Sequence, residues 1–234
     1  MKAQAGRERT ESYVHVHQLA HPRTPVPGAR GGSFVTISRE AGAGASSLAL
    51  LLQQRLETNG HKPWAVFDGN LIAAMLHANH LPPTLARYLP EARVSEIEAT
   101  IGEMVGLHPN LWELTRKTDE FIRLLAGSGH VILVGRGANF ATAALPHGVH
   151  VRLVAPVGHR ARVMAKRHQV SAEEAADHNR NQDRTRRRYV QTHFDAIGPD
   201  PTNYDVVINT GRVDLAQAAD LIVSLVVARH AVAA

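Results

Sequence analysis

Cysteine is absent from this chain of 234 residues, which excludes disulfide bonds, thiol catalysis and cysteine metal sites. Long apolar runs are also absent, because the longest one, LIVSLVVA from Leu221, is too short to cross a bilayer. Residues 1–30 are polar and lack the apolar centre of a secretory signal. Together these absences predict a cytoplasmic protein with no membrane partner.

Positive charge exceeds negative charge in what is present. The 26 lysine and arginine residues, against 21 aspartate and glutamate residues, give a formal charge of +5. An excess of this sign favours anionic partners such as nucleotides or nucleic acid. The length and a hydrophobic content of 44% are sufficient for one medium α/β domain with a sizeable core.

The segment 1–32 differs in composition from the rest of the chain. It contains HPRTPVPGARGG, and proline and glycine at that density disfavour regular structure, so we predict a flexible N-terminal tail. The alternating stretch YVHVHQ within it is suited to a short strand on a partner subunit, which suggests a homodimer. We predict one folded domain over 33–234.

Apolar runs alternate with helical patterns along this domain. Five runs are predicted to be buried strands: FVTI from Phe34, WAVF from Trp64, HVILVG from His130, VHVRLVA from Val149 and YDVVINT from Tyr204. Strands that alternate with helices predict right-handed crossovers and a parallel sheet. The helix after the first strand is expected to bury an apolar stripe made by Leu48, Leu51, Leu52 and Leu56.

Three local signals refine the predicted helices. Gly60 is suited to a left-handed cap at the end of the first helix. Ser171 and Glu174 have the spacing of a capping box at the start of a later, polar helix. A helical pattern also covers 81–127, where proline residues interrupt it.

The bend REAGAGASS follows the first predicted strand directly and resembles a phosphate-binding loop. Gly42 and Gly44 allow the chain to turn its N–H groups inward, and Ser46 can offer a hydroxyl to a phosphate or to Mg²⁺. The usual pattern of such a loop is incomplete, because Arg39 stands at its first glycine and Ala45 at its lysine. A strand-to-helix turn that binds nothing is the alternative interpretation.

A second candidate region is the arginine-rich stretch HNRNQDRTRRRYVQTHF. A helix there would place Asp183, Arg186 and Tyr189 close to one face. Clustered arginines repel one another unless an anion gathers them, and guanidinium groups suit phosphate oxygens. The alternative is a solvated charged helix. Nucleic acid is a competing anion, but few aromatic residues interleave with the arginines, which argues against stacking on single strands.

Taken together, the motifs resemble the cytidylate kinase-like family of P-loop proteins. The matching pieces occur in family order from about Phe34 to Leu225, and they are VTISREAGAGASSLA, FDGNLI, VILVGRGANF, VRLVAPVGHRARVMAKR, DRTRRRY and DPTNYDVVINT. The resemblance implies a three-layer P-loop NTPase fold, α/β in class, with a five-stranded parallel sheet. It also implies a helical acceptor-binding insert at 81–127 and an arginine-rich lid at 171–203.

The resemblance further implies ATP and Mg²⁺ as cofactors and a role for each motif. The loop would cradle the β-phosphate through Gly42, Ala43, Gly44, Ala45, Ser46 and Ser47, with the Ser46 hydroxyl on the metal ion. In the lid, Asp183 and Arg186 match a helix whose arginines clamp the transferring phosphoryl group. The acceptor would be bound by Asp68, Arg136, Arg160 and Arg167.

Two of these assignments have structural alternatives, and one feature of the loop needs a substitute. Arg136 can also be explained as an arginine paired with a carboxylate, and Asp68 as the cap of a helix that follows it. We expect Arg39 to replace the missing lysine, because it is the only cation between Phe34 and Arg55.

Three functions are compatible with the sequence. The first is a kinase that phosphorylates a nucleoside monophosphate, CMP-like, or a related small acceptor. The second is a nucleotide-binding regulatory protein with weak or no catalysis. The third, less favoured, is a nucleic-acid-binding protein that uses the arginine helix.

Overall fold

The computed structural model describes residues 32–60, 62–69 and 111–232. Nearly all of the predicted tail, 1–32, and most of the predicted insert, 81–127, lie outside the described residues. Within them, no helix is long and apolar enough to cross a membrane.

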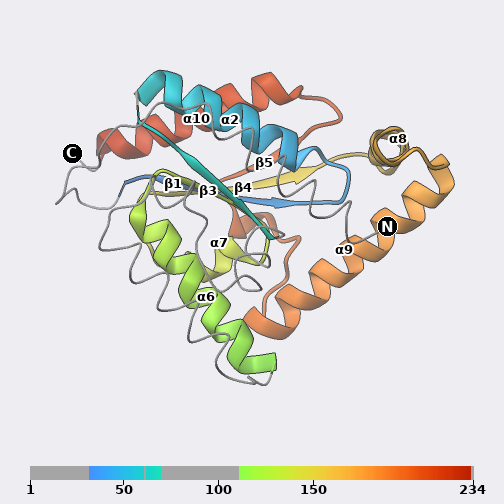
Figure 1. Ribbon diagram of the computed structural model, residues 1–234, viewed down its shortest axis with the longest axis horizontal. Coiled ribbons are helices and arrows are strands. Elements are labelled where there is room, and N and C mark those ends of the chain that lie inside the picture. Colours follow the sequence, from blue (N-terminus) through green and yellow to red (C-terminus); the bar gives the residue numbers. More distant parts are fainter. Residues whose placement is uncertain (1–31, 61, 70–110, 233–234) are drawn as a thin grey trace, which may run out of the picture.

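A five-stranded parallel sheet forms the middle layer, with strand order β2-β3-β1-β4-β5 (Figure 1). Its strands are β1 (Phe34–Arg39), β2 (Ala65–Asp68), β3 (Val131–Val134), β4 (Gly148–Val154) and β5 (Val206–Asn209). The predicted strands and their parallel arrangement are confirmed. The central strand, β1, is paired with β3 on one side and β4 on the other, so the carboxyl end of β1 lies between those of its two neighbours.

Helices cover both faces of this sheet (Figure 1). One face carries α2 (Ala45–Gly60) and α10 (Leu215–Val232), which pack on each other, and the opposite face carries α6 (Leu111–Ser128) and the short α7 (Ala138–Ala141). At one edge of the fold, α8 (Val157–His168) and α9 (Ala172–Phe194) form a helical pair, and the turn η2 (Pro201–Asn203) leads back to β5. The three-layer α/β class is therefore confirmed.

The core consists of two apolar clusters, one on each face of the sheet. The cluster under α2 and α10 includes Leu48, Leu52 and Leu56 of the predicted stripe, whereas Leu51 packs at its margin. The second cluster is formed mainly by residues of α6, α7 and the opposite faces of β2 and β3. Because both faces of β3 are covered, its sequence, VILV, is continuously apolar.

Two of the local signals had different outcomes. The capping box at the start of α9 is confirmed: the Ser171 hydroxyl accepts the Glu174 N–H, and the Glu174 carboxylate accepts the Ser171 N–H. The prediction for Gly60 is wrong, because Gly60 is the last helical residue of α2 and does not have the positive φ of a left-handed cap. Because the backbone is still helical at Gly60, no left-handed residue is needed there.

Replacing Leu52 by alanine should test the packing of α2 on the sheet. Leu52 is fully buried, so Leu52→Ala should lower the free energy of unfolding by about 2–5 kcal/mol through lost burial and the cavity that remains. Leu221→Ala is the matched control, because Leu221 lies on α10 and is 47% exposed. Denaturant unfolding monitored by circular dichroism measures both, and equal effects would contradict the assigned core.

Candidate functional site

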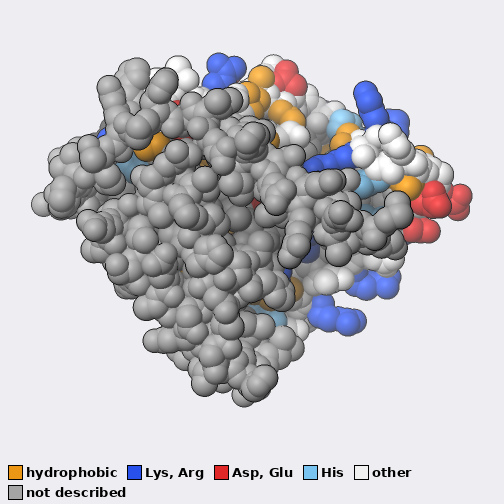
Figure 2. Space-filling view, in the orientation of Figure 1, with side chains coloured by type: hydrophobic (Ala, Val, Ile, Leu, Met, Phe, Trp, Pro, Cys, Tyr) orange, Lys and Arg blue, Asp and Glu red, His pale blue; other side chains and the backbone are white. Residues whose placement is uncertain are grey.

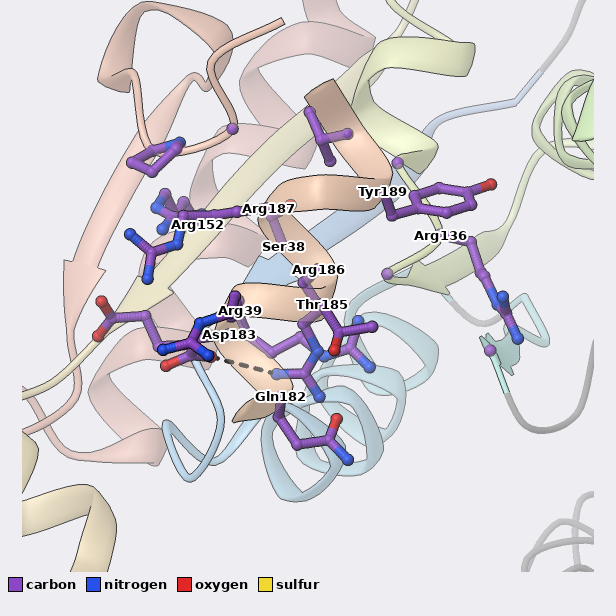
Figure 3. Close-up of a pocket in the computed structure, with 18 of the residues that line it drawn as sticks. Ser38, Arg39, Arg136, Arg152, Gln182, Asp183, Thr185, Arg186, Arg187 and Tyr189 are labelled. Carbon is purple, nitrogen blue, oxygen red and sulfur yellow. Dashed lines mark ion pairs between the residues drawn. The ribbon is translucent and has the colours of Figure 1, made fainter. Parts of the chain in front are cut away.

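A cavity of about 640 Å³ opens where β1, β3 and β4 end, beside α9. Its walls come from the last residues of β1, the loop after β3, the inner face of β4, the middle of α9 and the loop before β5 (Figure 3). In parallel α/β sheets, ligands bind at the carboxyl ends of the strands. The position and size of this cavity are therefore those of a small-molecule site.

Arginine dominates the lining of the cavity. Two carboxylates, Glu40 and Asp183, face eight arginines: Arg39, Arg136, Arg152, Arg160, Arg180, Arg184, Arg186 and Arg187. In the view of Figure 2, most of the visible basic side chains gather near α8 and α9. A cleft lined by one sign of charge attracts ligands of the opposite sign, and guanidinium groups bind phosphate or carboxylate oxygens in pairs.

Arg39 is the arginine at the centre of the cavity (Figure 3). Burial, together with the nearby cations Arg186 and Arg136, lowers its pKa to about 10, although Asp68 and Asp183 oppose the shift. The guanidinium group lies against the backbone of Gly135, where the Cβ of any other residue would overlap the Arg39 Nη1 atom. A glycine at the end of β3 is thus required for Arg39 to occupy this place.

The loop between β1 and α2 has the glycine geometry that the sequence suggests. Gly42 and Gly44 have φ angles of 81° and 84°, so both adopt the left-handed conformation. The Ala43 N–H donates to the Glu40 carbonyl at 3.2 Å, which closes a turn inside the loop. Ala45, at the lysine position of a standard phosphate loop, is 6% exposed and belongs to the core under α2.

Arg39 and this loop are oriented toward different neighbours. A side chain at Gly42 would contact Arg160 and Met164 of α8, and one at Gly44 would contact Leu215. The Arg39 guanidinium instead rests on Gly135, the residue directly after β3. The cation therefore serves the cavity between β1 and β3, and not the space directly over the two glycines.

A buried network joins the loop to the arginine-rich helix. The Ala41 N–H donates to Asp183 Oδ1 at 2.7 Å, and Arg160 Nη1 donates to Asp183 Oδ2 at 2.7 Å. Arg160 Nη1 also donates to the Ala41 carbonyl, and Arg160 Nε to the Ala155 carbonyl, both at 3.0 Å. Asp183 thereby fixes α9 to the start of the loop.

Glu40 completes the pairing of Arg160. Its Oε2 atom lies 3.3 Å from Arg160 Nε and accepts the Ala155 N–H at 3.1 Å. Arg160 is 8% exposed, and its donors are directed to protein oxygens. The contacts of Arg160 are those of a residue that holds the loop, α8 and α9 together; its predicted contact with an acceptor remains a prediction.

Arg186 lies on the same face of α9 as Asp183. Its Nη1 atom is 3.7 Å from Asp183 Oδ1, and the Arg186 Nη1 atom is buried without a hydrogen-bond partner among the described residues. Burial lowers the pKa of Arg186, and Asp183 partly opposes that shift. Arg39 and Arg186 are thus two desolvated cations that share one carboxylate neighbour.

Arg136 extends the cavity toward α6. It stands between Gly135 and Gly137, and all three residues have positive φ angles, at 85°, 55° and 67°. Its side chain passes Gly69, where a Cβ would lie 3.2 Å from Arg136 Nε. Close packing against Gly69 therefore directs this arginine along the cavity wall.

The structure brings together only some of the predicted site residues. Five of them line the cavity, namely Arg39, Arg136, Arg160, Asp183 and Arg186. The loop residues from Gly42 to Ser47 lie outside that lining, and so does Asp68, which nevertheless acts on the charge of Arg39. Arg167 is exposed in the last turn of α8, away from the cavity.

Sequence reasoning missed Arg152 and Tyr204 as cavity residues. On β4, Val149, Val151 and Leu153 face the core, so the intervening Arg152 faces the other side of the sheet. A charged residue inside a predicted buried strand was a signal that could have found it. Tyr204 carried no comparable signal, because its place depends on the loop before β5.

Behind the cavity wall, α6 contributes a carboxylate with a raised pKa. Burial raises the pKa of Asp119 to about 6 against the opposing effect of Arg123, and its Oδ1 atom has no hydrogen-bond partner among the described residues. Burial and the charge of Asp119 also raise the pKa of Tyr189, a cavity residue, to about 12. The Tyr189 hydroxyl is therefore protonated at neutral pH.

The model of the cytidylate kinase-like family matches residues 34–212 of the chain. This range includes every strand of the sheet and every residue that lines the cavity. A comparison with curated proteins found no match.

Among solved structures, an uncharacterized protein from Eubacterium ventriosum is similar to this chain with a TM-score of 0.62 and 19% identity, covering 84% of this chain and 99% of that one. Two kinases superpose less closely. APS kinase from Mycobacterium tuberculosis, solved with AMPPNP and APS, has a TM-score of 0.46 and 16% identity, covering 84% and 98%. Shikimate kinase from Bacteroides thetaiotaomicron has values of 0.45 and 10%, covering 82% and 97%.

Neutralising Asp183 should loosen the junction between the loop and α9. Asp183→Asn keeps an acceptor for the Ala41 N–H but removes the charge that faces buried Arg160, so the free energy of unfolding should fall by about 1–3 kcal/mol. Asp177→Asn, which breaks an exposed ion pair with Arg180 on the same helix, should cost under about 0.5 kcal/mol. Denaturant titration compares them; equal losses would refute a structural role for Asp183.

Asp119 should make stability depend on pH. Its pKa is about 6 in the folded chain, above the ordinary value of 3.8, so the folded state binds the proton more tightly and stability falls as pH rises from 4 to 6. Asp119→Asn removes this dependence and should be more stable than the parent at pH 7, by about 1 kcal/mol once solvent screening is allowed for.

The control for this change is Glu120→Gln, the exposed neighbour on α6. That variant should keep most of the pH dependence. Thermal unfolding between pH 4 and 8 measures all three proteins. Parallel curves for Asp119→Asn and the parent would show that folding does not shift the pKa of Asp119, contrary to this assignment.

Proposed function

The chain belongs to the cytidylate kinase-like family, and from this premise we propose that it transfers the γ-phosphoryl group of ATP to a nucleoside monophosphate, CMP-like, or a related small acceptor. The observation that carries the proposal is the arginine-lined cavity at the carboxyl ends of β1, β3 and β4. Phosphoryl transfer needs positioning and charge neutralisation more than it needs a nucleophilic side chain. A cavity rich in guanidinium groups and poor in carboxylates supplies that neutralisation.

The residues of the cavity suit distinct parts of such a reaction. Arg39 and Arg186, both desolvated, are placed to bind the oxygens of the phosphoryl group that is transferred. Arg136, on the opposite wall, is placed to bind the phosphate of the acceptor. Asp183 acts as a positioning residue, since it holds Arg160 and orients α9 over the loop.

The Mg²⁺ that accompanies ATP has donors in the chain that fit its chemistry. Among the described residues there is no cluster of three or more histidines and carboxylates. Mg²⁺ in kinases needs no such cage, because one or two protein oxygens, substrate phosphates and waters complete its coordination. The Ser46 hydroxyl, at the start of α2, and the Asp68 carboxylate, at the end of β2, would hold it. Bound there, the ion would neutralise phosphate charge.

A second function remains in competition, and particular observations favour it. Ala45 is buried in the core, so the start of α2 offers no lysine that could contact the phosphates during transfer. The Ala41 N–H is bound to Asp183 and the Ala43 N–H to Glu40, so two loop amides have protein partners. A protein with these features would bind a nucleotide and report on it without rapid turnover.

A screen of purified protein decides between the two functions. A coupled assay with ATP and Mg²⁺ measures ADP release in the presence of each common nucleoside monophosphate. We expect release above the ATPase background with one of them. Thermal unfolding in parallel should show a nucleotide-dependent rise in melting temperature, since a ligand of the folded state stabilises it. A rise without turnover supports the regulatory function, and no rise at millimolar concentrations contradicts both.

Arg39→Gln should separate binding from stability. Removing this cation relieves its repulsion with Arg186 and Arg136, so the ligand-free variant should melt at the same temperature as the parent or higher. Its affinity for ATP–Mg²⁺ should nevertheless fall by about 1.5–3 kcal/mol, the value of a hydrogen bond to a charged group.

Arg55→Gln is the matched control, because Arg55 is an exposed residue of α2 that pairs with Asp220. It should leave affinity unchanged. Calorimetric titration gives the affinities and differential scanning calorimetry the melting temperatures. Unaltered affinity in Arg39→Gln would remove Arg39 as the substitute for the missing lysine.

A further inference from the structure

The arginines of the cavity separate into two groups along its length (Figure 3). Arg39 and Arg186 lie beside Asp183, with Arg136 and Tyr189 to one side of them. Arg152 and Arg187 lie on the other side, where their guanidinium groups come from β4 and α9. The proposed phosphoryl transfer uses the first group and leaves the second without a function.

Arg152 is held in place by its surroundings and points into the cavity. In the sheet it is the direct partner of Ser38 on β1, another cavity residue. Its guanidinium carbon lies 5.6 Å from the centre of the Tyr204 ring, a cation–π contact. The Tyr204 hydroxyl in turn donates to the Gly198 carbonyl at 2.7 Å, which fixes the ring. The cation is thus pre-positioned, so an anion would bind there with little ordering cost.

Neither arginine of the second group has a carboxylate counter-charge among the described residues. No described carboxylate forms an ion pair with Arg152 or Arg187, whereas Arg180 and Arg186 each pair with one and Arg160 with two. Two guanidinium groups that face one cavity and form no ion pair with a described carboxylate repel each other, and an anion between them removes that repulsion. The electrostatics of this end therefore favour a bound anionic group.

We propose that Arg152 and Arg187 form a second anion subsite, and that the acceptor is a nucleotide-sized molecule with a second phosphate separate from the one bound at Arg136. The inference rests on the proposed kinase function in so far as it calls the ligand an acceptor, whereas the subsite itself concerns binding only. The cavity volume of about 640 Å³ accommodates a ligand of that size. Arg152 and Arg187 determine specificity: they distinguish a bisphosphate from a monophosphate.

Binding measurements without ATP test the subsite independently of catalysis. The probes are cytidine 5′-monophosphate and cytidine 3′,5′-bisphosphate, titrated calorimetrically into the full chain at one ionic strength. The parent should bind the bisphosphate at least about tenfold more tightly, the value of one charge-assisted contact. Arg152→Gln and Arg187→Gln should each remove most of that preference and change the affinity for the monophosphate by less than about twofold.

Two further variants make the comparison specific. Arg188→Gln is the matched control, because Arg188 follows Arg187 on α9, is exposed and lies outside the cavity. It should keep the full preference for the bisphosphate. Arg152→Lys keeps the positive charge and should retain part of the preference, which a purely structural role of Arg152 would not predict. Thermal unfolding of each variant verifies that it is folded.

The outcomes are distinguishable from those of the proposed function. A parent that binds both probes equally, or neither, overturns the subsite whatever its kinase activity. If Arg152→Gln lowers the affinity for both probes equally, the subsite is also overturned. A larger loss of affinity for ATP than for the probes overturns it too, because Arg152 would then bind the phosphoryl donor. A bisphosphate preference that depends on Arg152, in a protein without turnover, supports the subsite and contradicts the kinase.

Discussion

The carboxylate of Asp183 is the group on which the arrangement of the cavity depends. It accepts the N–H of Ala41 at 2.7 Å and binds Arg160 Nη1 at the same distance, so one residue of α9 holds both the phosphate-type loop and α8. A carboxylate that makes two short, partly buried contacts is stronger as an anchor than an exposed ion pair. Without it, α9 has no charged attachment to the loop among the described residues, and the arginines that α9 carries would lose their position relative to Arg39.

This anchor gathers cations that oppose one another. Arg39 has a pKa lowered to about 10, in which burial is the largest cause and Arg186 the next. The folded chain therefore holds an unfavourable concentration of positive charge, as binding sites often do at the expense of stability. A phosphorylated ligand would reverse the sign of this contribution, because each guanidinium group would gain an anionic partner. Ligand binding and the position of α9 are for this reason expected to be thermodynamically coupled.

The sequence predicted the fold more completely than the site. A strand such as β3 was recognisable because burial on both faces makes it continuously apolar, and the capping box at Ser171 is a local pattern. The cavity depends on side chains whose directions are set by distant parts of the chain. Arg39 can lie at the end of β3 only because residue 135 is glycine, and Arg152 points inward because β4 pairs with β1 in one register. No local pattern contains such information.

The missing lysine has a structural explanation in the placement of charge. Ala45 is packed in the core at the start of α2, whereas the central cation, Arg39, extends from the end of β1 onto Gly135, directly after the adjacent strand. The positive charge of this region therefore lies on the strand side of the loop, where Arg186 of α9 adjoins Arg39. A lysine at the start of a helix depends on no second element for its position, but a pair of arginines from β1 and α9 is complete only when α9 is docked. The juxtaposition of Arg39 and Arg186 is thus a property of the docked helix, which Asp183 anchors to the loop.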